Sequence, residues 1–186
     1  MDRYAARVKA PALLLLVVTP WSYAQSSTPT RKADRIVIVK STRTMMLMSG
    51  DKVLKTYKVA LGTEPVGAKE RQGDHKTPEG EYMVDAKNPN SRFHPALHIS
   101  YPNAADRERA RKLGVNPGGD IEIHGLEPKY AWLGAAHRTM DWTDGCIAVT
   151  NPEIEEIWRL VDVGTRVEIL AEPKPEKKET PNKKSR

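Results

Sequence analysis

The chain has 186 residues, a formal net charge of +6 and a single cysteine. This length suits one ordinary domain, and one thiol excludes both an internal disulfide framework and a zinc site built from four cysteines. A positive excess is typical of nucleic-acid-binding proteins only where it gathers on the folded part of the chain.

Residues 1–24 have the layout of a secretory signal peptide. Three basic residues within the first nine precede an apolar run over residues 10–18, and Ser22-Tyr23-Ala24 forms a small-x-small cleavage site. The run is too short for a membrane-spanning helix, which needs about 20 apolar residues. A buried N-terminal helix is the alternative. We expect cleavage after Ala24 and export to a bacterial periplasm, with no transmembrane segment.

The ends of the chain account for the net charge. Residues 25–33 are rich in Ser, Thr and Pro and predict a flexible linker, and residues 172–186 contain nothing apolar and predict a disordered basic tail. The signal-like segment contributes +2, the linker +2 and the tail +3, which leaves −1 for residues 34–171. The predicted domain is nearly neutral, so we expect no nucleic-acid partner.

Residues 34–171 predict a mainly β domain. Short β-branched or alternating segments indicate strands at residues 35–39, 44–48, 53–60, 80–84, 97–101, 121–123 and 167–170. Two helices are expected, at about 104–113 and at 152–161, the second capped by Asn151 with Pro152 in its first turn. Many short strands and few helices favour a β-sandwich or barrel-like domain.

The residues that suggest chemistry gather around Cys146. Gly145 permits a tight turn or a close approach to a ligand, and Thr143 and Asp144 add polar groups that are costly to bury without partners. A sequence-distant histidine is the usual companion of a nucleophilic cysteine, and His124 ends a strand-like segment upstream. A small buried hydrophobic cysteine is the alternative, but this context favours a nucleophile.

A nucleophilic cysteine acts as its thiolate, whereas a free thiol has a pKa near 8.5. A neighbouring imidazole either stabilises the thiolate as an ion pair or removes the thiol proton. The backbone N–H groups of Gly145 and Cys146 are the expected donors to an oxyanion.

The other histidines are weaker candidates. His137 is a rival base, but it lies in a polar segment rather than at a strand end. His94 and His98 are expected to be structural, with contact to a substrate cleft as the alternative, and His75 is expected in an exposed loop. No histidine pair has the spacing of a helical zinc motif, so we expect no metal and no cofactor.

Two motifs, Ile-His-Gly at 123–125 and Thr-Asp-Gly-Cys-Ile at 143–147, resemble the catalytic domain of the L,D-transpeptidases of the YkuD or ErfK type. Segments 35–39, 59–62 and 76–80 and the Gly50-Asp51 hairpin are also similar to that family, so the resemblance covers roughly residues 34–171. It implies a β-sandwich with one or two short helices and cysteine-dependent acyl transfer on peptidoglycan stem peptides.

Carried over by position, the resemblance makes Cys146 the nucleophile and His124 the base and later the acid, with the Gly125 carbonyl orienting the ring. Thr143 and Gly145 match the family's turn before the nucleophile. Cys146 would attack the carbonyl of the third residue of a tetrapeptide stem and expel the terminal D-Ala. An acceptor amine, commonly from a second stem, would then resolve the thioester.

Two positions depart from the family pattern. Asp144 stands where a histidine is frequent and adds negative charge near the thiolate, and Ala148 stands where Arg or Asn is frequent and cannot bind a carboxylate. The segment 126–141 is also longer than usual. It forms either a lid over the cleft, through Tyr130, Trp132, Arg138 and the adjacent Trp142, or a packed surface loop. His98 and Tyr101 are further cleft candidates.

Three functions remain open from the sequence. The first is an L,D-transpeptidase that cross-links peptidoglycan or attaches proteins to it. The second is a carboxypeptidase or amidase that gives the same thioester to water. The third is a non-catalytic protein that binds the cell wall. The oligomeric state is not predicted.

Overall fold

The computed structural model describes residues 31–174. The predicted signal segment, its cleavage site after Ala24, most of the linker and most of the basic tail lie outside the described residues. Within 31–174, no helix combines the length and the apolar character needed to cross a bilayer.

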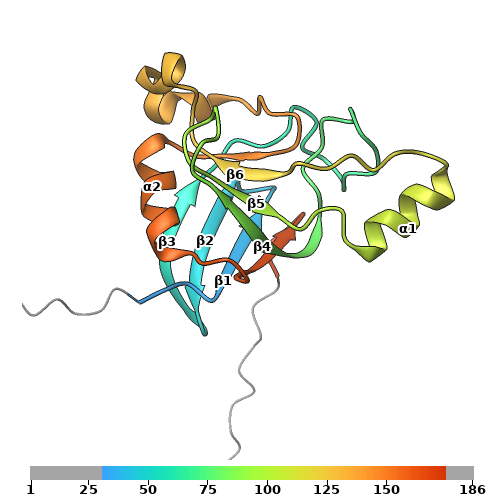
Figure 1. Cartoon of the computed structure of the whole chain (residues 1–186), viewed down its shortest axis with the longest axis horizontal. Helices are drawn as coiled ribbons and strands as arrows, with labels where there is room; N and C mark the ends of the chain where they lie inside the picture. Colours follow the sequence, from blue (N-terminus) through green and yellow to red (C-terminus); the bar gives the residue numbers. More distant parts are fainter. Residues whose placement is uncertain (1–30, 175–186) are drawn as a thin grey trace, which may run out of the picture.

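Eight strands and three helical segments make up the described chain (Figure 1). In chain order they are β1 (Arg35–Val39), β2 (Thr44–Ser49), β3 (Lys52–Lys58), β4 (Gly80–Asn88), β5 (Ala96–Ile99), α1 (Ala104–Leu113), β6 (Glu122–His124), η1 (Pro128–Thr139), β7 (Ile147–Ala148), α2 (Asn151–Leu160) and β8 (Arg166–Leu170).

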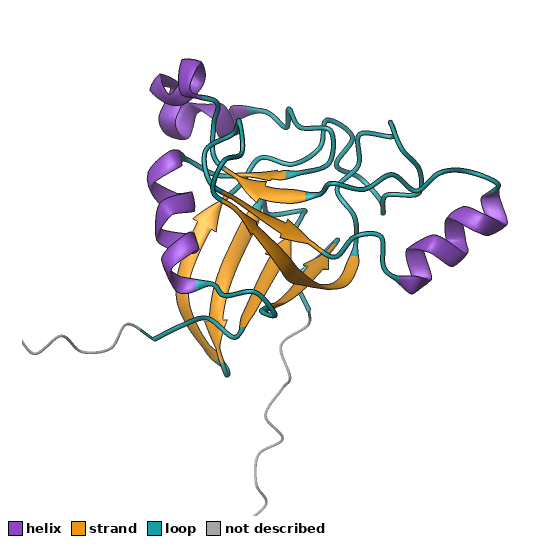
Figure 2. Cartoon of the chain, in the orientation of Figure 1, coloured by secondary structure: helices purple, strands orange, loops and turns teal. Residues whose placement is uncertain are grey.

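The strands form one strongly curled sheet in the order β3-β2-β1-β8-β4-β5-β6-β7 (Figure 2). Strand β4 turns the corner, because its first half pairs with β8 and its second half pairs with β5. The register shifts between Val84 and Ala86, which is the irregularity expected where a strand bends. The short strands β6 and β7 therefore lie at one end of the sheet and β3 at the other.

A backbone bridge joins these two ends. The Ala60 N–H donates to the Ala148 carbonyl and the Ala148 N–H donates to the Ala60 carbonyl, both at 2.9 Å. A second bridge pairs Gly62 with Thr143. These contacts bring the chain that follows β3 against the turn that contains Cys146.

The core fills the inside of the curl. Helix α2 closes one side, and Ile154 and Ile157 on its inner face are fully buried. Helix α1 lies on the opposite side of the molecule (Figure 1), where buried Asp106 accepts a hydrogen bond from Tyr82 at 3.0 Å. The largest fully buried side chains come from the strands and α2: Ile36, Ile38, Met45, Leu47, Leu61, Leu97, Ile99, Ile123, Ile147, Ile154, Ile157 and Ile169.

The mainly β prediction is confirmed, and both expected helices are present at nearly the expected bounds. Segment 126–141 forms the 3-10 helix η1 instead of a loop, broken at Gly134, whose φ is 46°. The N-cap prediction for α2 is wrong by one residue: Thr150 is the cap, and its backbone N–H and its hydroxyl both donate to Glu153. Strand β7 was not expected, because two residues leave no periodic pattern to detect.

Gly62 allows the loop of His75 to approach the Cys146 turn. A Cβ at Gly62 would lie 2.1 Å from the His75 carbonyl oxygen and 3.2 Å from the Gly145 Cα, and both are backbone atoms. We expect Gly62→Ala to lower the free energy of unfolding by about 3 kcal/mol, because backbone atoms cannot move aside as a flexible side chain can. Urea unfolding followed by tryptophan fluorescence measures the change.

Gly119→Ala is the matched control, since no atom lies within 4 Å of a Cβ there and its φ is not in the left-handed region. Its effect should stay within about 0.5 kcal/mol. Equal stability of the two variants would contradict the close contact at Gly62.

Candidate active site

Strand pairing places His124 and Cys146 on the same face of the sheet. Strands β6 and β7 run parallel with Ile123 opposite Ile147, so Cys146, just before β7, stands beside Glu122. Alternate residues of a strand face the same way, and Ile123 and Ile147 point into the core. His124 and Cys146 both line a cavity of about 610 Å³ on the other face.

The His124 ring is held in one orientation. Its Nδ1 lies 2.7 Å from the Gly125 carbonyl oxygen, so Nδ1 carries the proton in the neutral ring and Nε2 is left as an acceptor. The Phe93 ring lies 4.6 Å from it and the Trp142 ring 6.0 Å, measured between centroids. Burial lowers the pKa of His124, and the Arg92 charge adds to this, while the bond to Gly125 opposes it.

Gly125 is required by helix α2. A Cβ at Gly125 would lie 2.5 Å from the side-chain oxygen of Asn151. That oxygen accepts the Leu126 N–H at 2.6 Å. The first residue of α2 therefore fixes the backbone that orients His124, which explains why Asn151 is not free to cap its own helix.

The turn before Cys146 is fixed by Thr143. The Thr143 hydroxyl donates to the Cys146 carbonyl at 2.7 Å and accepts the Gly145 N–H at 3.2 Å. Gly145 has a φ of 127°, and a Cβ there would lie 2.6 Å from the Lys76 carbonyl oxygen. Of the two donors expected for an oxyanion, the Gly145 N–H is thus engaged, and only the Cys146 N–H lacks a partner within residues 31–174.

The Cys146 thiol is protonated at neutral pH. Burial raises its pKa to about 11, and the carboxylates of Glu122, Asp144 and Asp120 add to the effect. The Glu122 N–H donates to the sulfur at 3.4 Å, and this bond offsets part of the rise in the thiol pKa. The thiol donates weakly to the Asp120 carbonyl at 3.5 Å. With the pKa of His124 lowered, the pair rests as thiol and neutral imidazole. Two neutral partners of this kind favour removal of the thiol proton during attack over a preformed ion pair.

The structure adds an imidazole to this cavity that the sequence did not indicate. His75 Nδ1 lies 2.8 Å from the Asp144 carboxylate, and both side chains line the cavity with Cys146. His75 and Asp144 are 69 positions apart, and no local pattern connects them. Arg92 and Phe93 also line the cavity and were missed, because the segment between β4 and β5 shows no motif.

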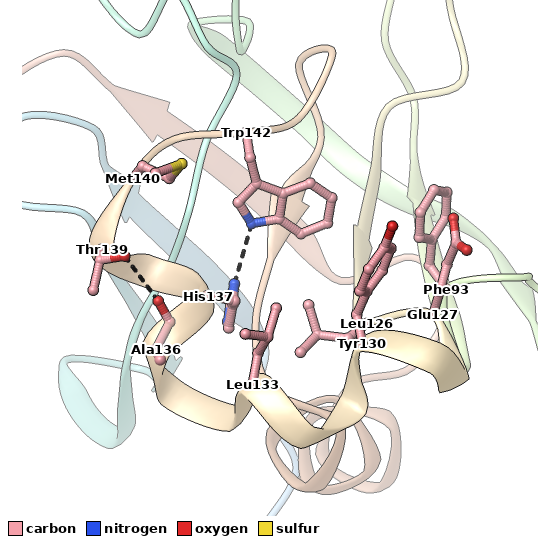
Figure 3. A pocket seen from close by; sticks show the side chains of 10 residues that line it. All are labelled: Phe93, Leu126, Glu127, Tyr130, Leu133, Ala136, His137, Thr139, Met140 and Trp142. Atoms are coloured by element: carbon pink, nitrogen blue, oxygen red, sulfur yellow. Dashed lines mark hydrogen bonds between the residues drawn. The ribbon is translucent and has the colours of Figure 1, made fainter.

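A second cavity, of about 340 Å³, lies between η1 and the wall formed by Phe93, Leu126 and Trp142 (Figure 3). Its lining is almost entirely apolar, and it shares Phe93, Glu127 and Trp142 with the first cavity. Segment 126–141 therefore does not cover Cys146 as a lid. It packs beside the cavity and encloses an apolar space of its own.

Of the expected cleft residues, Trp142 lines both cavities, and its Nε1–H donates to His137 Nδ1 at 3.2 Å (Figure 3). His137, the rival base, is buried in the second cavity and does not line the first.

The other four expected cleft residues line neither cavity. Trp132 is 80% exposed on the outside of η1. Arg138 donates to the Lys58 carbonyl at 2.7 Å and so ties η1 to β3. His98 faces Asp85 at 2.6 Å. Tyr101 is buried against Tyr82, and its hydroxyl donates to the Pro117 carbonyl. These four side chains do not reach the cavity of Cys146, because the helix, strand or loop that carries each of them turns it toward other partners or toward solvent.

Alkylation of Cys146 with iodoacetamide should report the raised thiol pKa. Since that pKa is about 11 rather than 9.0, the thiolate fraction at pH 8 should be about 100-fold below that of a free thiol. We expect the rate, followed by intact mass, to keep rising beyond pH 9. The same reaction in urea supplies the free-thiol reference, and a folded-state plateau below pH 8 would contradict the assignment.

His137 should make stability depend on pH. Burial lowers its pKa to about 4, and Arg138 adds to this. In the unfolded chain His137 is protonated below about pH 6.5, whereas in the folded chain it stays neutral down to about pH 4. The free energy of unfolding is therefore unaffected by this group above pH 6.5. It falls as the pH drops from 6.5 to 4, by about 3 kcal/mol in all. In His137→Phe this loss is absent. Urea unfolding of both proteins from pH 7 to pH 4 should show the difference between their free energies of unfolding change by about 3 kcal/mol. A difference that stays constant over this range would contradict the lowered pKa of His137.

Comparisons with known proteins identify the family of the domain. The YkuD family, described as the L,D-transpeptidase catalytic domain, matches residues 33–169. YafK of Escherichia coli (strain K12), which bears an L,D-transpeptidase name, is 35% identical over 111 residues, covering 59% of this chain and 37% of that protein. YqjB of Bacillus subtilis (strain 168), named in the same way, is 27% identical and is covered to 80%.

Solved structures share the fold. The helical cell shape determining protein Pgp2 from Campylobacter jejuni superposes with a TM-score of 0.59 and 25% identity, over 78% of this chain and 50% of that one. An L,D-transpeptidase from Xylanimonas cellulosilytica gives 0.51 at 16% identity, over 76% of this chain and 62% of that one. The match thus spans only about a third to a half of the length of YafK and Pgp2. With the family match extending over nearly all the described residues, the chain belongs to the YkuD family of L,D-transpeptidase catalytic domains.

Proposed function

We propose that this protein is an exported, cysteine-dependent L,D-transpeptidase that acts in the periplasm on tetrapeptide stems of peptidoglycan. The observation that carries the proposal is the shared cavity of Cys146 and His124, in which the bond to Gly125 leaves the His124 Nε2 free. Residues 34–171 are the proposed catalytic unit.

In the first half-reaction, Cys146 Sγ attacks the carbonyl carbon of the third stem residue. His124 Nε2 takes the thiol proton as the sulfur–carbon bond forms, so a full thiolate is never required, which suits a thiol with a raised pKa. The Cys146 N–H stabilises the oxyanion. When the amide bond breaks, His124 returns the proton to the leaving D-Ala amine, and the acyl group remains on Cys146 as a thioester.

Arg92 is the proposed partner for the carboxylate of the stem, a role that Ala148 does not take, because Ala148 is fully buried in β7. The Arg92 side chain is 76% exposed at the cavity, lies 4.5 Å above the Phe93 ring and reaches Glu127 at 3.6 Å. A guanidinium binds carboxylates in a bidentate manner, and stacking on an aromatic ring restricts its motion.

Transfer of the same thioester to water is the second candidate. It is favoured by the exposure of the cavity rim, where the Asp120 and Asp144 side chains stand in solvent and segment 126–141 does not close over Cys146. A purely wall-binding role gives no purpose to the cavity that Cys146 and His124 share.

Mass analysis of products from tetrapeptide-bearing muropeptides tests the proposal. We expect cross-linked dimers formed with loss of D-Ala, and an acyl adduct on Cys146. Cys146→Ala should abolish both, and His124→Gln should slow acylation by about 10² to 10⁴, the usual contribution of a general base.

Trp132→Ala is the control, because that side chain is exposed away from both cavities, and it should act like the unmodified protein. Trimmed monomers without dimers would favour the hydrolase. A protein that forms no adduct and behaves like Cys146→Ala would contradict the enzymatic proposal.

A further inference from the structure

Asp144 is unfavourable for the nucleophile it adjoins. It stands two residues before Cys146, and its negative charge raises the pKa of the thiol. Its carboxylate is 92% exposed, so it contributes little to packing. Its one close partner within residues 31–174 is His75 Nδ1, at 2.8 Å. A charge that hinders thiolate formation therefore serves to hold an imidazole at the cavity.

The backbone holds His75 in this place. The Glu64 N–H donates to the His75 carbonyl at 3.1 Å. Gly62 and Gly145 lack the side chains that would collide with the carbonyls of His75 and Lys76, respectively. His75 itself has a φ of 53°, a left-handed conformation that is uncommon for a residue with a Cβ. Strain of this kind persists only where the surroundings impose it, and it clusters at functional sites.

Asp74, the carboxylate next to His75 in the chain, already has its own partners. Asp74 pairs with buried Lys69 at 2.7 Å and accepts the backbone N–H groups of Glu70 and Arg71. Asp144 is thus the carboxylate left to anchor the ring, and Lys76 is the adjacent cation.

The bond from Nδ1–H to Asp144 leaves the His75 Nε2 with its lone pair and no partner within residues 31–174. His124 has the same arrangement, with Nδ1–H donating to Gly125. The cavity thus contains two imidazoles, each oriented through Nδ1 and each presenting a free Nε2. His124 is buried, whereas the His75 side chain is 49% exposed at the rim.

We propose that His75 is the acceptor-side base, which takes the proton of the primary amine that attacks the Cys146 thioester, and that Asp144 is its positioning residue. The inference rests on the proposed transpeptidase function and divides its two half-reactions between two histidines. The exposed Asp120 and Asp144 carboxylates also favour a cationic acceptor, because they give the rim a negative charge.

In this step the amine nitrogen bonds to the thioester carbon and the carbon–sulfur bond breaks. The proton lost by the nitrogen passes to His75 Nε2 and from there to solvent at the rim. The Cys146 sulfur regains a proton from solvent through His124. An amide and a free thiol result, and both imidazoles end neutral.

Rapid mixing of the full chain with a synthetic tetrapeptide stem separates the two half-reactions. Release of D-Ala and the mass of the Cys146 adduct report acylation, and disappearance of the adduct on adding a second stem reports transfer to its amine. In His75→Gln we expect acylation within about twofold of the unmodified protein and transfer slowed by about 10² or more. Hydroxylamine, which is uncharged at neutral pH, should discharge the adduct at the same rate in both.

His94→Gln is the matched control. His94 forms the same kind of pair, with Glu155 at 2.7 Å, but lines neither of the two cavities around Cys146. Both half-reactions should be unchanged in it.

Asp144→Asn supplies a readout that a structural role would not produce. Losing the charge should speed alkylation of Cys146, because Asp144 raises the thiol pKa. It should also slow transfer to the stem amine, because the neutral amide oxygen of Asn holds the His75 Nδ1–H less strongly than a carboxylate does.

Two results would overturn the inference alone: unchanged transfer in His75→Gln, or an equal loss of acylation and transfer. An unmodified protein that never forms the adduct would overturn the proposed function, and the acceptor role with it. The adduct measurement distinguishes the two failures.

Discussion

The paired hydrogen bonds between Ala60 and Ala148 join the two ends of the curled sheet, and the site around Cys146 depends on them. Without this bridge, the end of β3 and the start of β7 would be separated by the whole width of the sheet. With it, the chain that follows Ala60 runs beside the turn at Thr143–Cys146. Gly62 and Gly145 then allow backbone to touch backbone at distances that any side chain would prevent.

Burial is the second constraint, and it favours the neutral form of both proposed reacting groups. Removing Cys146 from water disfavours its thiolate, and removing His124 from water disfavours its imidazolium. A pair of neutral groups costs less to bury than an ion pair. The proposed chemistry is therefore a concerted proton removal by His124, and the most exposed carboxylates of the cavity, Asp120 and Asp144, stand at its rim.

Strand periodicity predicted much of the fold, because the β-branched segments at β1 and β8 and the helical spacing of Ile154 and Ile157 are local signals. The motifs around His124 and Cys146 were also local. The strand β7, the helix η1 and the Thr150 cap were not predicted correctly, since each is decided by contacts made after the sheet has curled. The cleft positions of Trp132 and Arg138 were not supported for the same reason: η1 turns one outward and the other toward β3.

The sequence by itself determined the class of the domain and the near neutrality of residues 34–171, and it singled out Cys146 and His124 as candidates. Composition, periodicity and short motifs carry this information because they do not depend on distant contacts. Only the tertiary structure decided that His75 meets Asp144 and that Arg92 and Phe93 wall the cavity. His75, Arg92 and Phe93 are separated from Cys146 by dozens of positions, and their proximity to it arises from the closure of the sheet. A sequence records which groups are available, whereas the backbone bridges decide which of them share one cavity.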